Sequence, residues 1–256
     1  MTIRLLCLFF ASALVGTNLY AQENCSKDVL SAIEKYLTTK KHLGVGNVVS
    51  TACKPWPHDN STILSATAFQ ASPENEVLLS IAMLDRRSNS VIAENTRTVS
   101  QDAAVHFGEG SLKLDTAPYH LAKGVTAFGV RFTSDAPGPS CADGAWSEEL
   151  NLYVRQGTGL RFVLQGLAME RQQALEGCFG PAASKLIFER ASLSLSISKT
   201  STNGLADLVV TAKISEDGDL IPGTSKSSVE HYTLRFDGHE YREPRPSPWW
   251  LTIFRP

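Results

Sequence analysis

The chain has 256 residues, of which 43% are apolar and 20% charged, and its formal net charge is −2 at pH 7. This balance is typical of an ordinary globular protein, and it lacks the basic excess that favours binding to nucleic acid. Beyond the N-terminus, no apolar run reaches the roughly 20 residues that a transmembrane helix needs. We therefore expect no nucleic-acid partner and no transmembrane segment in the mature protein.

Residues 1–21 have the order of a secretory signal peptide. Arg4 supplies the basic end, an apolar run extends over 5–15, and the small residue Ala21 precedes the expected cleavage site. A buried core helix is the alternative interpretation of this apolar run. We expect a mature protein that begins at Gln22 and lies in the periplasm or outside the cell.

Four cysteines remain once the expected signal peptide is removed. An even number in an exported chain favours disulfides over free thiols. Three pairings can be drawn, and we expect Cys25–Cys53 and Cys141–Cys178 because each closes a local loop. Zinc binding is the alternative, but the sequence has no C-x-x-C motif. No cofactor and no metal ligand are predicted.

One helix is predicted near the N-terminus of the mature chain, over 26–37. Apolar residues recur there at helical spacing, and Ser26 is suited to the N-cap position. The chain then changes to short apolar runs separated by turn residues such as Asn203-Gly204, which is typical of β-hairpins. About a dozen strands follow from this pattern. The predicted fold is mainly β, an antiparallel sandwich or a barrel-like meander of hairpins with one N-terminal helix.

The clearest hairpin is predicted over 149–168. Apolar and polar residues alternate in both arms, so each arm should be a half-buried strand with one apolar face. Gly157 and Gly159 lie in the turn, where they can supply the positive φ that tight hairpins need.

The stretch 134–144 is rich in turn-forming residues and is either a domain boundary or a long loop. We favour the loop, and hence a single exported β-rich domain over 22–256. Residues 169–175 follow the hairpin, and they form either a short helix or the continuation of a strand.

Several local patterns occur together across most of the mature chain. They are CKPWP at 53–57, GVTAFGVR at 124–131, LNLYVRQGTGLRFV at 150–163, GLADLVV at 204–210 and LRFDGHEY at 234–241. Together they resemble a family of uncharacterised exported β-rich proteins of Gram-negative bacteria. The resemblance implies a periplasmic location, and it supplies no activity and no catalytic residue.

The sequence contains no G-x-S-x-G elbow, no phosphate-binding glycine loop and no H-E-x-x-H zinc pattern. Trp56, Trp249 and Trp250 lie beside prolines, where they either cap the end of a β core or form a flat binding surface. We predict a non-enzymatic exported β domain that binds an unidentified protein or cell-envelope component, with these tryptophans as candidate binding residues. The alternative is a secreted or periplasmic hydrolase whose site is assembled only by the fold, because such sites leave no mark in sequence.

Overall fold

A computed structural model describes residues 24–138, 144–176, 186–218, 225–243 and 245–254. The expected signal peptide, Cys141 and Cys178 lie outside these residues. Within them the protein is mainly β, with one helix and twelve strands, as the sequence predicts. The elements in chain order are α1 (Lys27–Lys40), β1 (Val48–Trp56), β2 (Asp59–Gln70), β3 (Glu76–Asp85), β4 (Val91–Ser100), β5 (Leu112–Ala122), β6 (Val125–Phe132), β7 (Gly144–Gln156), β8 (Gly159–Glu176), β9 (Ile187–Thr202), β10 (Leu205–Gly218), β11 (Ser227–Phe236) and β12 (Tyr241–Arg242).

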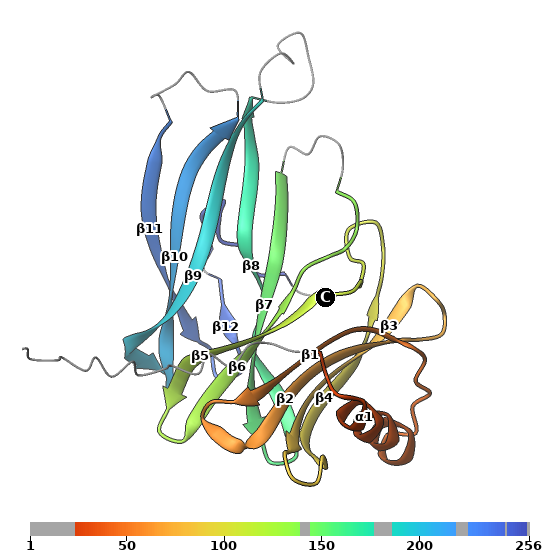
Figure 1. The fold of residues 1–256 in the computed structure, drawn as a ribbon. Helices are drawn as coiled ribbons and strands as arrows, with labels where there is room; N and C mark the ends of the chain where they lie inside the picture. The colour runs from red at the N-terminus through yellow and green to blue at the C-terminus, as the bar shows by residue number, and fades with distance from the viewer. Residues whose placement is uncertain (1–23, 139–143, 177–185, 219–224, 244, 255–256) are drawn as a thin grey trace, which may run out of the picture.

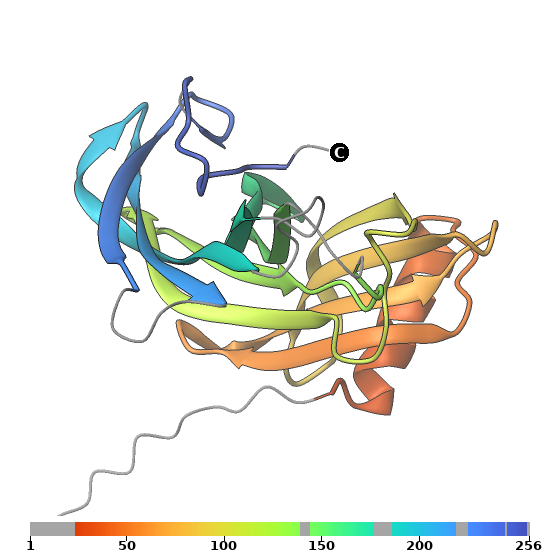
Figure 2. The same cartoon turned by 90° about the horizontal axis from the view of Figure 1, so that it is seen from above.

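The strands form one large mixed sheet that is strongly curved and not closed into a barrel (Figures 1 and 2). Strands β1 to β4 form one antiparallel meander, β5 to β8 a second, and β8 continues through β9 and β10 to β11. Strand β4 joins β8 in parallel through the pair Glu94 and Gly159. Figure 2 shows the consequence, two curved lobes with β5 to β8 between them.

One edge of strand β8 pairs with β7. The other edge has three neighbours in succession. Its first residue pairs with β4, and its end pairs with β9 from Glu170 onward. Between them lies the C-terminal segment 251–254, through the antiparallel pair Leu167 and Ile253. Gly166, with φ of 69°, allows this approach, since a Cβ there would lie 2.3 Å from the Phe254 carbonyl oxygen. The sheet therefore branches at β8.

Two hydrophobic clusters lie on opposite faces of β7. The N-terminal cluster packs residues of β1 to β4 against β5 to β8, with Phe128 and Tyr153 at its centre. The C-terminal cluster packs β5 to β12 against the C-terminal segment and includes Leu152 and Trp250. The expectation of a half-buried strand is therefore wrong for β7. Its two faces are both buried over 150–154 because a layer of sheet covers each of them.

The β7–β8 hairpin forms where it was predicted, with its turn at Gly157 and Thr158. Gly157 has a φ of 64°, whereas Gly159 is not among the residues with positive φ. One glycine therefore provides the left-handed conformation, not two. Residues 169–175 continue β8 as a strand, which settles the choice between strand and helix.

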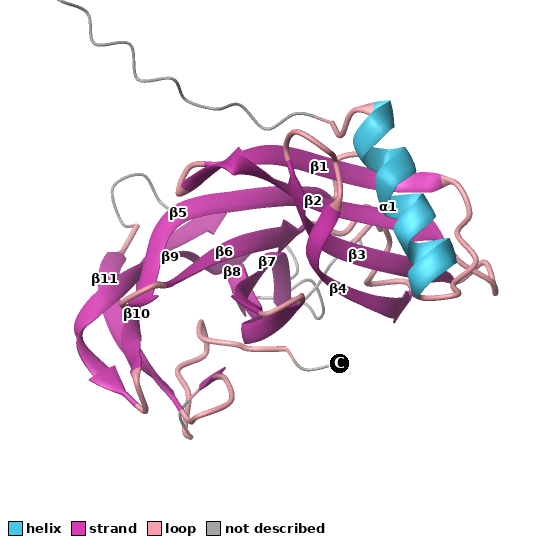
Figure 3. Ribbon diagram, turned by 90° about the horizontal axis from the view of Figure 1, so that it is seen from below, coloured by secondary structure: helices cyan, strands magenta, loops and turns pink. Residues whose placement is uncertain are grey.

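Helix α1 begins after the predicted N-cap, where the Ser26 hydroxyl accepts a hydrogen bond from the Val29 amide. Its buried residues, Val29, Ile33 and Leu37, pack on the outer face of the β1–β4 sheet (Figure 3). No helix in the described part of the chain has the length and apolar character required to cross a bilayer.

The Cys25–Cys53 disulfide is present, as predicted, and it joins the residues before α1 to β1. The second predicted pair, Cys141 with Cys178, falls outside the described residues. Strand β1 contains Pro55 and lies at one end of the strand order, where a residue without a backbone N–H is tolerated.

Candidate functional site

A pocket of about 490 Å³ opens into the N-terminal cluster between β4 and the β5–β8 meander. Its volume lies within the range of small-molecule sites. Most of its lining is apolar or aromatic and comes from several strands and from the C-terminal segment, including Leu79, Val99, Phe107, Phe132 and Phe254. An adjoining hollow of about 420 Å³ shares Trp146 and Glu149 with it.

Trp146 and Glu149 form the polar side of the pocket from one segment of β7. In a regular strand, residues three apart point to opposite faces. Glu148, between them, has a φ of 55°, which interrupts the alternation. As a result both side chains line the pocket, and the Trp146 indole Nε1 donates to the Glu149 Oε1 at 3.1 Å. The Trp146 ring also packs against Phe254, with ring centroids 4.7 Å apart.

The Glu149 carboxyl group has an altered proton affinity. Burial raises its pKa above the ordinary range, and the hydrogen bond from Trp146 and the charge of Arg97 oppose this only in part. The neutral form of Glu149 is therefore favoured more than in a solvated glutamate.

Arg97 enters the pocket from β4, on the strand face that also carries Val99. Its guanidinium carbon lies 5.1 Å from the centre of the Phe162 ring, a cation–π contact. Its Nε atom is buried and has no hydrogen-bond partner among the described residues. A buried donor without a partner is costly, so this half-buried arginine requires an explanation.

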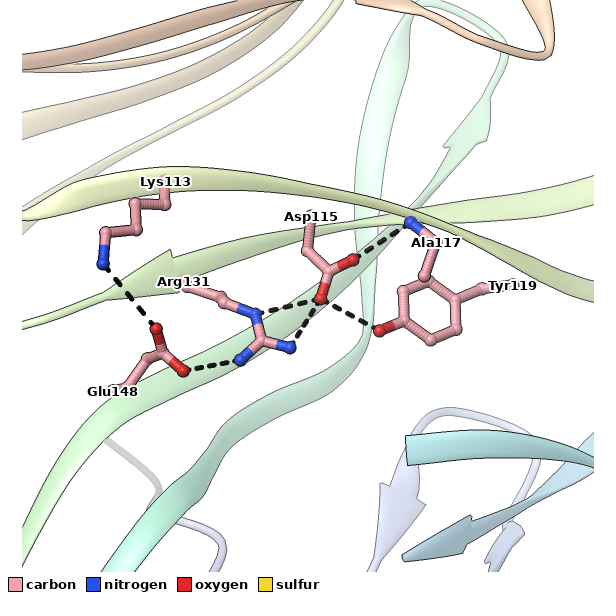
Figure 4. Close-up of polar contacts among 6 residues, drawn as sticks. All are labelled: Lys113, Asp115, Ala117, Tyr119, Arg131 and Glu148. Carbon is pink, nitrogen blue, oxygen red and sulfur yellow. Dashed lines mark hydrogen bonds and ion pairs between the residues drawn. The ribbon is translucent and has the colours of Figure 1, made fainter. Parts of the chain in front are cut away.

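Arg131 is another half-buried arginine, and its guanidinium is fully paired with carboxylates (Figure 4). Its Nε and Nη2 both donate to Asp115 Oδ2, at 2.9 and 2.7 Å, and its Nη1 donates to Glu148 Oε2 at 2.6 Å. Asp115 also accepts from the Tyr119 hydroxyl at 3.1 Å and from the Ala117 amide at 3.0 Å. This network ties β5, β6 and β7 together. Arg97 has no equivalent carboxylate partner among the described residues.

The three tryptophans predicted as binding residues lie in two different clusters. Trp56 is half-buried against the N-terminal cluster, with its ring 6.1 Å from that of His58. Trp249 is half-buried against the C-terminal cluster, and Trp250 belongs to that cluster with 1% of its surface exposed. None of the three lines the pocket described above.

Sequence reasoning did not single out the pocket residues Arg97, Trp146 and Glu149. Arg97 lies in β4, but the sequence gives no sign that its side chain points inward. The spacing of three residues between Trp146 and Glu149 predicts opposite faces of a regular strand. The two side chains line the same pocket only because the backbone at Glu148 is irregular. Among the described residues, no group of three or more His, Cys, Asp or Glu side chains is arranged to hold a metal ion.

Comparison with protein-family models, curated proteins and solved structures found no match. The geometry of the pocket is therefore the main guide to function.

Replacing Glu149 with glutamine should change the pH dependence of stability. Because the pKa of Glu149 is raised in the folded protein, the folded state holds the proton more tightly than the unfolded state. Wild-type stability relative to Glu149→Gln should therefore fall as the pH rises above about 4.3, the ordinary glutamate pKa. Urea unfolding of both proteins across this range measures the difference. The same substitution at exposed Glu109 is the control, and a pH-independent difference at Glu149 would contradict the prediction.

Proposed function

We propose that this protein is an exported, non-enzymatic binding protein that takes a small apolar or amphipathic component of the cell envelope into the pocket beside Trp146. The observation that carries the proposal is a largely apolar pocket of about 490 Å³ with a few convergent polar groups. Such concave, mostly apolar sites with sparse polar groups are typical of small-molecule binding.

The polar groups of the pocket favour binding over hydrolysis. Hydrolases of the common types use a nucleophile with an adjacent base, or a pair of carboxyl groups. The described lining residues include one carboxyl group, that of Glu149, and its Oε1 accepts a hydrogen bond from Trp146. Export to the periplasm or the exterior is supported by the N-terminal sequence pattern and by the Cys25–Cys53 disulfide.

Filling the pocket should abolish ligand binding. The probe is N-phenylnaphthylamine, a neutral apolar dye whose fluorescence rises in an apolar site. The wild-type protein should bind it saturably, and Val99→Trp should weaken binding by roughly tenfold or more, because the larger side chain occupies the space of the ligand. Val229→Trp is the matched control, since Val229 on β11 is 58% exposed.

Thermal melting of each variant separates loss of binding from loss of fold. If Val99→Trp does not fold, Val105→Trp tests the same wall from a loop. Absence of saturable dye binding by the wild-type protein would overturn the proposal. Unchanged binding by a folded, pocket-filled variant would do the same.

A further inference from the structure

The side chain of Arg97 forms no ion pair and no hydrogen bond with a described residue, although its charge acts on the nearby carboxyl group of Glu149. Arg97 lines the pocket, its Nε is buried without a partner, and the face of Phe162 stabilises its guanidinium only partly. Arginine remains protonated in proteins, so this charge is permanent. A complementary anion would supply the missing hydrogen bonds.

Glu149 does not complete this site. No ion pair or hydrogen bond joins it to Arg97 in the described structure, and one of its oxygens is engaged by Trp146. Burial favours its neutral form by raising its pKa. Glu149 therefore does not supply Arg97 with a hydrogen-bonding carboxylate in the described structure.

The rest of the pocket fits an unbranched apolar chain. Beside the polar residues Thr98, Ser100, Asn151 and Gln165, much of the remaining lining consists of aliphatic and aromatic side chains, with Phe107 and Phe132 in contact at a centroid distance of 4.5 Å. An acyl chain would gain from leaving water in proportion to the apolar area that it buries. A planar carboxylate matches the guanidinium fork, which forms two parallel hydrogen bonds to such a group.

We infer that the ligand of this pocket is a single-chain amphiphile with a carboxylate, whose head group binds Arg97 and whose chain lies along the apolar walls. This inference rests on the proposed function and narrows it to one ligand class. Arg97 has the role of a head-group anchor, and the aromatic side chains hold the chain.

The test compares two probes of equal chain length, decanoate and decanol, in competition with N-phenylnaphthylamine. Decanoate is ionised at neutral pH, whereas decanol is neutral, so the two differ in the charge that Arg97 would bind. The wild-type protein should bind decanoate roughly tenfold more tightly than decanol, as expected for a charge-assisted hydrogen-bonded pair. Arg97→Gln should weaken decanoate binding roughly tenfold more than it weakens decanol binding, which would remove this preference.

Arg87→Gln is the matched control, because exposed Arg87 lies in the turn at the other end of the same β3–β4 hairpin. It removes the same charge from the protein and should preserve the preference for decanoate. If Arg97→Gln weakens both probes equally, Arg97 has a structural role and the inference fails. It also fails if the wild-type protein binds both probes equally, whereas a wild-type protein that binds neither the dye nor decanol overturns the proposed function itself.

Discussion

Replacing Trp250 with alanine should lower the free energy of unfolding by about 3–5 kcal/mol, the range for removing a large aromatic side chain from a core. Trp250 is 1% exposed within the C-terminal cluster, and its indole Nε1 donates to Glu230 Oε2 on β11 at 2.6 Å. The substitution therefore leaves a cavity and also removes the partner of a carboxylate. Such a loss is a large fraction of the stability of a typical domain.

Urea unfolding of the two adjacent tryptophan variants measures this effect. Trp249→Ala is the matched control, because Trp249 is half-buried at the edge of the same cluster and should cost distinctly less. If both variants lose an equally small amount of unfolding free energy, the stability of the C-terminal cluster does not depend on Trp250. The dye-binding assay adds a second readout, since Trp250 does not line the pocket.

Reducing the Cys25–Cys53 disulfide should cost about 3.5 kcal/mol, less any strain that reduction relieves. The figure follows from the entropy of closing a loop with a sequence separation of 28 residues. Loss of the bond also releases the N-terminal end of α1, whose buried residues include Val29 and Ile33.

Urea unfolding of the double variant Cys25→Ser with Cys53→Ser measures the same loss of unfolding free energy without a reductant. Each single variant should match the double variant, because either change removes the bond. Peptide mapping without reduction should recover Cys25 linked to Cys53, and by the sequence-based prediction Cys141 linked to Cys178. Recovery of Cys25 as a free thiol in the untreated protein would contradict the first pairing.

The sequence was informative about elements with local signals. Ser26 and the apolar spacing after it define α1, and alternating residues with a glycine turn define the β7–β8 hairpin. These features are predictable because they depend on interactions between residues close together in the chain. Whether a strand buries one face or both depends instead on layers of sheet formed by residues far away in the sequence. The local pattern of β7 does not reveal these layers, so the strand was expected to be exposed on one side.

The candidate site was not predictable in the same way. Arg97 and Glu149 come from strands that are joined only through the branch at β8, and the position of Trp146 depends on the irregular conformation of Glu148. The tryptophans chosen from their proline-rich surroundings lie in or against the hydrophobic clusters. Neighbouring prolines indicate a rigid backbone, but they do not indicate whether the adjacent aromatic side chain faces solvent.

The branch at β8 has a consequence for the order in which the molecule is completed during synthesis. Strand β4 emerges from the ribosome long before β8, the strand that it joins, and the middle of β8 must wait for the segment 251–254. Domains generally begin to fold from the N-terminal end as the chain emerges. Here the nascent chain carries an unfinished sheet until its last described residues appear, and Phe254 then closes the pocket wall against Trp146. Removing residues 251–254 should therefore open this wall and leave the middle of the β8 edge unpaired.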